Sequence, residues 1–151
     1  MTNNQFWEQI TYFRPEEFGI VGHMLELQAQ EARDNMNPQL ILKLDSLREF
    51  VGRSLIIHAG FEVSGHSPGS QHYLGNAADF HIEGLSLLEQ YLAAERFNFS
   101  AIGLYPFWER PGLHCDVRPL GLRQPGPRWF RDGQGTYLAL TARLLEELKI
   151  R

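Results

Sequence analysis

The sequence predicts an α+β fold in which helices flank a small antiparallel sheet. Three observations lead to this prediction. A helical repeat of apolar residues spans 37–52, short apolar segments bounded by turn residues occur at 54–61 and 101–105, and a second helical repeat ends the chain at 136–150. A chain of 151 residues can bury its own core, so we expect residues 1–151 to form a single domain.

Helical signals come first along the chain. Pro15 lies near the start of 13–36 and is followed by acidic residues, a combination typical of a helix N-terminus. The segment 37–52 has the stronger pattern, with Pro38 at its start and Gly52 at its end. Its apolar stripe consists of Leu40, Ile41, Leu44, Leu47 and Phe50. A helix over 37–52 is therefore predicted.

Strand and loop signals follow. The apolar segment 54–61 predicts a buried strand, the Gly- and Ser-rich residues 64–70 predict a loop, and a second strand is expected at 78–82. The next helix is expected over 84–97. Its apolar side would carry Leu85, Leu88, Tyr91 and Leu92.

The C-terminal third completes the predicted sheet. Segments 101–105 and 112–119 are expected to be strands, separated by the proline-containing connection "PFWERPG". The last segment, 136–150, has the apolar spacing of an amphipathic helix.

Composition limits the classes of partner and compartment. A net charge of −4 without a basic cluster argues against a nucleic-acid surface. No window approaches the ~20 apolar residues of a membrane span, and the N-terminus lacks the basic start and apolar run of a secretory signal. The single cysteine, Cys115, cannot form an internal disulfide. We therefore expect cytoplasmic synthesis and no membrane insertion.

A metal site is the chemistry that the sequence suggests most directly. Catalytic zinc usually has three protein ligands and one open position, and His72, Asp79 and His114 would supply such a set. If 113–117 is a strand, Asp116 lies on the same face as His114 and could transfer protons there. Cys115 would then point the other way.

Other histidines have simpler interpretations. His58, His66 and His81 are expected to be structural or surface residues, although His81 shares a predicted strand face with Asp79 and could approach the same site. Cys115 is expected to be a small buried residue rather than a ligand.

Several blocks of sequence resemble one known family. The segment "SQHYLGNAADFHIEG" resembles the Ser-x-His-x-x-Gly-x-Ala-x-Asp signature of the zinc D-alanyl-D-alanine carboxypeptidases, with matches at Ser70, His72, Gly75, Ala77 and Asp79. The segment "IGLYPFWERPGLHCDVRP" is similar to the second family block, in which Gly-x-Tyr-Pro precedes a strand carrying His-x-Asp. "YFRPEEF" and the pair Arg128–Trp129 also match, so the resemblance covers roughly residues 12 to 130.

The resemblance implies a zinc peptidase with a fold related to the hedgehog signalling domain. One zinc ion would be held by His72, Asp79 and His114. Relatives cut peptidoglycan stem peptides or cross-links next to D-amino acids, and some are phage endolysins, which would reach the cell wall by a phage lysis route. Ser70 would lie beside the substrate.

The sequence also departs from the family at two places. Relatives usually have "SGYR" before the loop, whereas this chain has "AGFE", with Glu62 in place of the substrate-facing arginine. Arg118 and Arg110 are the candidate replacement cations. Many relatives place a catalytic base just before the last ligand, where this chain has Pro111 and Gly112. Asp116 is therefore the first candidate for the base and Glu109 the second.

Glu62 leads to two further expectations. If Glu62 faces the cleft, it would repel a free substrate carboxylate, and any peptidase activity would be endopeptidase in character. The alternative function is a catalytically inactive, zinc-stabilised module that binds the cell wall or a protein partner. Closure of the metal site by a fourth side chain, from Asp116 or His81, would favour that alternative.

Overall fold

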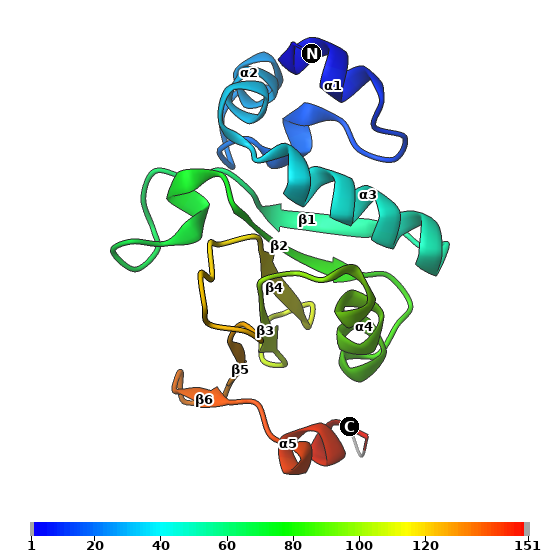
Figure 1. Cartoon of the computed structure of the whole chain (residues 1–151), viewed down its shortest axis with the longest axis vertical. Helices are drawn as coiled ribbons and strands as arrows, with labels where there is room; N and C mark the ends of the chain where they lie inside the picture. The colour runs from blue at the N-terminus through cyan, green and yellow to red at the C-terminus, as the bar shows by residue number, and fades with distance from the viewer. Residues whose placement is uncertain (1, 150–151) are drawn as a thin grey trace.

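A computed structural model of the chain describes residues 2–149 and has an α+β architecture built on one open sheet (Figure 1). The sheet has six strands in the order β1-β2-β4-β3-β5-β6. Their bounds are β1 Leu55–Ala59, β2 Ala77–Ile82, β3 Ala101–Tyr105, β4 Gly112–Asp116, β5 Arg128–Arg131 and β6 Tyr137–Ala139. The predicted fold class is therefore confirmed at the level of α+β.

The sheet is mixed rather than purely antiparallel, which corrects the prediction. Four neighbouring pairs are antiparallel, but β3 and β5 run parallel, with Gly103 opposite Trp129. The connection over 117–127 passes the end of β3 at which that strand begins, so β5 is antiparallel to β4 and runs in the same direction as β3. Strands β5 and β6 were not predicted, and they extend the sheet beyond β3.

Helices lie next to the β1 edge of the sheet, beside its central strands and, at the other end of the molecule, beyond β6 (Figure 1). Segment 13–36 contains a short 3₁₀ helix, which begins at Pro15, and a separate α-helix. The helices are α1 Asn3–Glu8, η1 Pro15–Phe18, α2 Leu25–Asn35, α3 Pro38–Val51, η2 Gln71–Leu74, α4 Leu87–Ala94, η3 Glu95–Phe97 and α5 Ala142–Leu148.

Helix α3 confirms the strongest helix prediction. The Asn37 side chain accepts a hydrogen bond from the backbone N–H of Gln39, and Gly52 ends the helix with a left-handed backbone at φ 64°. The apolar stripe is buried at Leu40, Ile41, Leu44 and Leu47. Phe50 is the exception, because it is half exposed and packs edge-on against Phe97.

Alternation along the central strands separates a core face from an open face. The core face carries Ala78, Phe80 and Ile82 of β2, Ile102 and Leu104 of β3, and Leu113 and Cys115 of β4. Helices α3 and α4 contribute their apolar sides to the same core cluster. The opposite face of these strands is left for polar side chains, which makes it the place for a site.

Three predicted elements differ in detail. Segment 54–61 forms an edge strand in which only Leu55 is buried, since β1 pairs on one side alone. On α4, Leu92 is exposed and Gln90 is buried instead, where its amide oxygen accepts a hydrogen bond from the backbone N–H of Ile82. The segment 136–150 is divided into β6 and the short α5, and its last residue, Ile150, lies outside the described residues.

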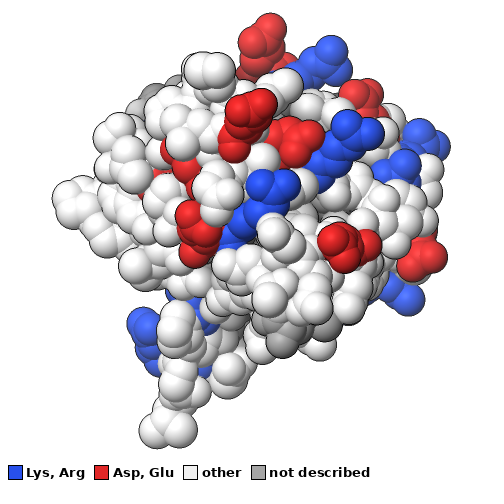
Figure 2. Space-filling model, turned by 90° about the horizontal axis from the view of Figure 1, so that it is seen from above, with Lys and Arg blue, Asp and Glu red and all other residues white. Residues whose placement is uncertain are grey.

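The surface is mixed in charge on the face seen in Figure 2, where acidic and basic side chains are interspersed. Among the described residues, no helix combines the length and the apolar character that crossing a bilayer requires.

Candidate metal centre

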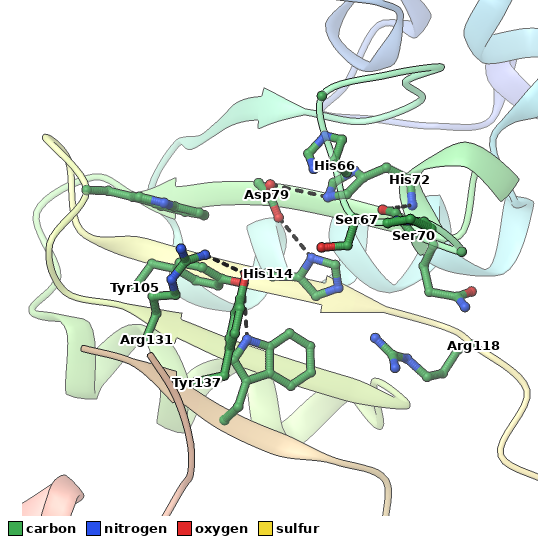
Figure 3. A pocket seen from close by; sticks show the side chains of 16 residues that line it. His66, Ser67, Ser70, His72, Asp79, Tyr105, His114, Arg118, Arg131 and Tyr137 are labelled. Atoms are coloured by element: carbon green, nitrogen blue, oxygen red, sulfur yellow. Dashed lines mark hydrogen bonds and ion pairs between the residues drawn. The ribbon is translucent and has the colours of Figure 1, made fainter. Parts of the chain in front are cut away.

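Three side chains with metal-binding atoms meet on the open face of the sheet (Figure 3). His72 comes from η2, Asp79 from β2 and His114 from β4. One nitrogen or oxygen atom from each lies within 4.8 Å of the others. His72 and His114 are buried and Asp79 is partly buried, so the group lies at the base of a depression rather than on an exposed surface.

Local sequence explains how η2 presents His72. Ser70 caps this short helix, with its hydroxyl oxygen accepting the backbone N–H of His72 at 3.2 Å. Gly75 ends the helix in a left-handed conformation at φ 72°, and a Cβ there would lie 1.8 Å from the carbonyl oxygen of Asn35. The glycine of the Ser-x-His-x-x-Gly pattern is therefore required both by backbone conformation and by close packing.

Sheet register places the other two residues together. Asp79 on β2 and His114 on β4 are direct partners in the antiparallel ladder. Their side chains point to the same face, with His114 Nδ1 at 3.0 Å from Asp79 Oδ1. Asp79 Oδ2 lies 3.2 Å from Nε2 of His72. The carboxylate therefore lies between the two imidazoles.

The orientation of His72 is set by the backbone after β1. Nδ1 of His72 lies 2.8 Å from the carbonyl oxygen of Gly60. A carbonyl can only accept, so Nδ1 carries a hydrogen and Nε2 is the nitrogen available for a ligand bond. The next residue, Phe61, donates its N–H to the carbonyl of Phe18 at 2.8 Å. The N-terminal segment "YFRPEEF" thereby holds the backbone that orients a site histidine.

A buried carboxylate orients His114. Nε2 of His114 lies 2.8 Å from Asp116 Oδ2, so this nitrogen donates to Asp116 and Nδ1 is left to face Asp79. Asp116 has no solvent exposure, and it also accepts three hydrogen bonds from the guanidinium and one from the backbone N–H of Arg118. Carboxylate partners of this kind fix the ring orientation of metal-binding histidines.

The pKa values of Asp79 and His114 indicate that the site stabilises positive charge. Burial opposes ionisation of Asp79, but hydrogen bonds and charge from His114 and His72 hold its pKa below the usual range. Burial lowers the pKa of His114, but its hydrogen bonds to Asp116 and Asp79 outweigh that effect and raise it to about 9. Without a metal ion, a proton on His114 thus supplies the positive charge between two carboxylates.

The group fits a divalent cation by its chemistry. Two imidazole nitrogens with fixed tautomers and one ionised carboxylate form a typical ligand set for zinc and for other first-row divalent ions. Within residues 2–149 the cluster contains these three donors and no fourth. The predicted residues His72, Asp79 and His114 are therefore brought together, and the arrangement could hold a metal ion.

Neither of the proposed closing residues occupies a fourth position. Asp116 contacts the nitrogen of His114 that faces away from Asp79. His81 is drawn to β1, where its Nδ1 lies 2.7 Å from Nε2 of His58. Burial lowers the pKa of both these histidines, so we expect two neutral rings that share one hydrogen. This pair could not be predicted from the sequence, because it depends on the pairing of β1 with β2.

The two candidate bases have different surroundings. Asp116 is enclosed by His114 and Arg118, which lower its pKa despite the opposing effect of burial. That placement favours an orienting role over the proton-transfer role predicted from the sequence. Glu109 is exposed and borders a second cavity of about 350 Å³ that also touches Asp79 and Trp108.

A larger cavity of about 610 Å³ opens over His72, Asp79 and His114. Predicted residues Ser70 and Arg118 line it, whereas Arg110 borders the second cavity. Its wall also contains residues that were not predicted, namely His66, Tyr105, Trp108, Trp129, Arg131 and Tyr137. Trp129 and Arg131 lie on β5, Tyr137 lies on β6 and Trp108 lies in the 106–111 connection, and no site was predicted from the sequence at these positions.

Glu62 is not among the described residues that line this cavity. It is partly buried, with a backbone hydrogen bond from Val21. Burial raises its pKa, while that hydrogen bond and the nearby His72 act in the opposite direction. The expected repulsion of a substrate carboxylate required Glu62 to face the cleft. Glu62 does not line the cavity, so this condition is not met.

Comparison with known proteins does not assign this chain to a family. No protein-family model matches this chain, and no curated protein is similar enough to be counted as a relative.

Proposed function

We propose that the protein is a metal-dependent peptidase with one zinc ion held by His72, Asp79 and His114. The observation that carries the proposal is a group of three donors, with no fourth among the described residues, at the base of a cavity of about 610 Å³. Structural zinc sites are usually closed by four protein ligands, whereas catalytic sites keep one position open. The cavity gives a peptide access to that position.

The reaction would be hydrolysis of an amide bond. The C–N bond breaks, the oxygen of water joins the carbonyl carbon, and a proton passes to the departing amine. A bound zinc ion would polarise the scissile carbonyl and lower the pKa of the attacking water to about 7.

The protein residues have separate roles in this proposal. Gly60 and Asp116 orient His72 and His114 through the far nitrogen of each ring. Glu109 is the carboxylate that we assign to proton transfer, since it borders the cavity shared with Asp79 and no hydrogen bond of the described residues involves its side chain. Ser70 and the aromatic side chains that line the cavity would hold the peptide. These side chains are Tyr105, Trp108, Trp129 and Tyr137.

We further propose peptidoglycan stem peptides or cross-links, cut next to D-amino acids, as the substrate. The support is the Ser70-to-Asp79 pattern together with its geometry, in which Ser70 caps η2, Gly75 ends it, and His72 and Asp79 meet at the candidate metal position. The endopeptidase preference inferred from Glu62 has no support from the cavity lining.

An inactive zinc-stabilised binding module is the alternative. It would be favoured by a fourth side chain at the metal position, and neither Asp116 nor His81 takes that place. Activity is therefore the first property to test.

The test is digestion of purified peptidoglycan fragments by the zinc-loaded protein, with the products identified by mass. We expect one bond type to be cut, and we expect His72→Ala and His114→Ala to lose both the metal and the cleavage. His23→Ala is the matched control, since His23 is exposed and pairs with Glu31 away from the cavity. Failure of the zinc-loaded protein to cut any fragment would reject the peptidase proposal, and full metal content in both variants would reject the site.

A further inference from the structure

The β5–β6 hairpin places a cation in the wall of the large cavity. Arg131 ends β5 and lines the cavity together with Asp79 and His114. In Figure 3, Arg131 and Arg118 lie on opposite sides of His114. The cavity therefore has a guanidinium at each end and the metal-binding group between them.

The two arginines differ in their charge balance. Arg118 is neutralised by the fully buried Asp116, with N–O distances of 2.7 to 3.0 Å. No carboxylate in the described part of the chain lies within ion-pair distance of Arg131. Arg131 is thus the arginine of the cavity wall whose charge the protein does not neutralise.

The guanidinium of Arg131 is held by its strand neighbour. Tyr137 on β6 is the direct partner of Arg131 in the ladder. The guanidinium lies 4.3 Å from the centre of the Tyr137 ring, and its Nη1 donates to the Tyr137 hydroxyl. Stacking and one hydrogen bond fix the plane of the group, while Nε and Nη2 have no hydrogen-bond acceptor among residues 2–149.

The hairpin is anchored to the rest of the site. Trp129, two residues before Arg131, lies on the same face of β5, and its indole Nε1 donates to the Tyr105 hydroxyl at 3.1 Å. Its ring centre is 5.2 Å from that of His114. The position of Arg131 is consequently coupled to the metal-binding group through packed side chains rather than through a free loop.

We propose that Arg131, positioned by Tyr137, binds a carboxylate of the peptide substrate on the β5–β6 side of the metal group. This inference rests on the proposed peptidase function and specifies its substrate class. An oriented guanidinium with free donors binds a carboxylate through two parallel hydrogen bonds, and its charge attracts an anion into the cavity. The preferred substrate is then a peptide with a free carboxylate near the scissile bond.

The experiment compares two forms of one peptide. An N-acetylated peptide ending in D-Ala-D-Ala is offered with a free C-terminal carboxylate or as the C-terminal amide, to wild type, Arg131→Gln, Arg131→Lys and Tyr137→Phe. Arg143→Gln is the matched control, because Arg143 is exposed on α5 and forms only a 3.9 Å surface pair with Glu147. Both kcat and KM are measured at saturating zinc.

We expect wild type to favour the carboxylate form. Arg131→Gln should raise KM for that form about tenfold or more and change kcat by less than about twofold, because one charge-assisted contact is lost from substrate binding. KM for the amide form should not change. Arg131→Lys should restore part of the preference for the carboxylate form, since lysine keeps the charge but lacks the planar guanidinium that donates two parallel hydrogen bonds. Tyr137→Phe should give an intermediate KM.

Two results would overturn the inference. One is an equal carboxylate preference in wild type and Arg131→Gln, and the other is an equal loss on both peptide forms. If neither form is cleaved, the peptidase proposal fails, and the same peptides are then titrated calorimetrically into the zinc-loaded protein. Tighter binding of the carboxylate form that Arg131→Gln abolishes would still support the anion site, whereas equal or absent binding would reject it.

Discussion

Each imidazole of the metal group has one nitrogen committed to the protein. His72 uses Nδ1 for the Gly60 carbonyl, and His114 uses Nε2 for Asp116. The two ligands therefore expose different nitrogens, Nε2 in one and Nδ1 in the other. Because these contacts are buried, we expect the other nitrogen of each ring to face the metal position before an ion arrives.

Asp116→Asn tests how Asp116 acts. The amide keeps the shape but removes the charge that pairs with Arg118 and polarises His114. We expect zinc affinity to fall by about 10- to 100-fold, with turnover at saturating zinc reduced much less. Competition with a chelating dye gives the affinity, and hydrolysis at saturating zinc gives the turnover. Normal affinity with a loss of turnover of about a hundredfold would instead identify Asp116 as the proton carrier.

The three residues of the candidate metal centre could be predicted from the sequence, because short local patterns contain them. His72 and Asp79 lie within one turn-strand unit, and His114 and Asp116 alternate on one strand. Arg131 could not be predicted in the same way. Its role depends on the absence of a carboxylate partner and on pairing with Tyr137, neither of which is visible before the hairpin is placed.

At the scale of elements, one row of residues crosses four strands. Asp79, His114, Gly103 and Trp129 are successive partners on β2, β4, β3 and β5. Gly103 is the small member of this row, and a Cβ there would lie 2.3 Å from the indole of Trp129. The missing side chain lets the indole lie across β3 towards His114.

Gly103→Ala should therefore displace Trp129. We expect the free energy of unfolding to fall by about 1–3 kcal/mol, because the extra methyl overpacks the row, and we expect the tryptophan fluorescence to shift. Urea denaturation followed by fluorescence measures both. Gly133→Ala is the control, since its new Cβ would meet only ordinary contacts with Phe107. Identical stability and spectra in wild type and Gly103→Ala would contradict the packing argument.

Short elements explain most of the differences between the predicted and observed fold. Strand β5 has four residues and β6 has three, too few for a clear alternation of apolar and polar side chains. The leucines of 136–150 also fit a helical repeat, so this segment was predicted to be one helix and β6 was not predicted. By contrast, α3 has fourteen residues and a cap at both ends, and its prediction is confirmed.

At the scale of the whole molecule, the shifted pKa values of several histidines make folding depend on pH. The pKa of His114 is raised to about 9 in the folded, metal-free protein, whereas the unfolded value is near 6.5. The resulting stabilisation is complete below pH 6.5 and is lost as the pH rises through 9. His58, His66 and His81 have lowered pKa values, mainly through burial, so they oppose folding as the pH falls below 6.5.

The metal-free protein should accordingly be most stable near pH 6.5. Between pH 6.5 and 9 we expect the free energy of unfolding to decrease by on the order of 2–3 kcal/mol, from the His114 contribution. Urea denaturation with a chelator present measures this decrease. Added zinc should remove it, since the ion replaces the proton on His114. A metal-free protein that is equally or more stable at pH 9 would contradict the proton assignment.

The alternation on β4 also affects the fidelity of folding. Leu113 and Cys115 face the core, while His114 and Asp116 lie on the opposite face of the strand, where His114 lines the cavity. If β4 slipped by one residue against β2, a histidine and an aspartate would enter the apolar interior without their partners. Such misfolded chains would be unstable and would lack the assembled metal group. The register that packs the interior correctly is therefore the same register that assembles the metal group. A chain with mispaired strands would be less stable and more open to proteolysis.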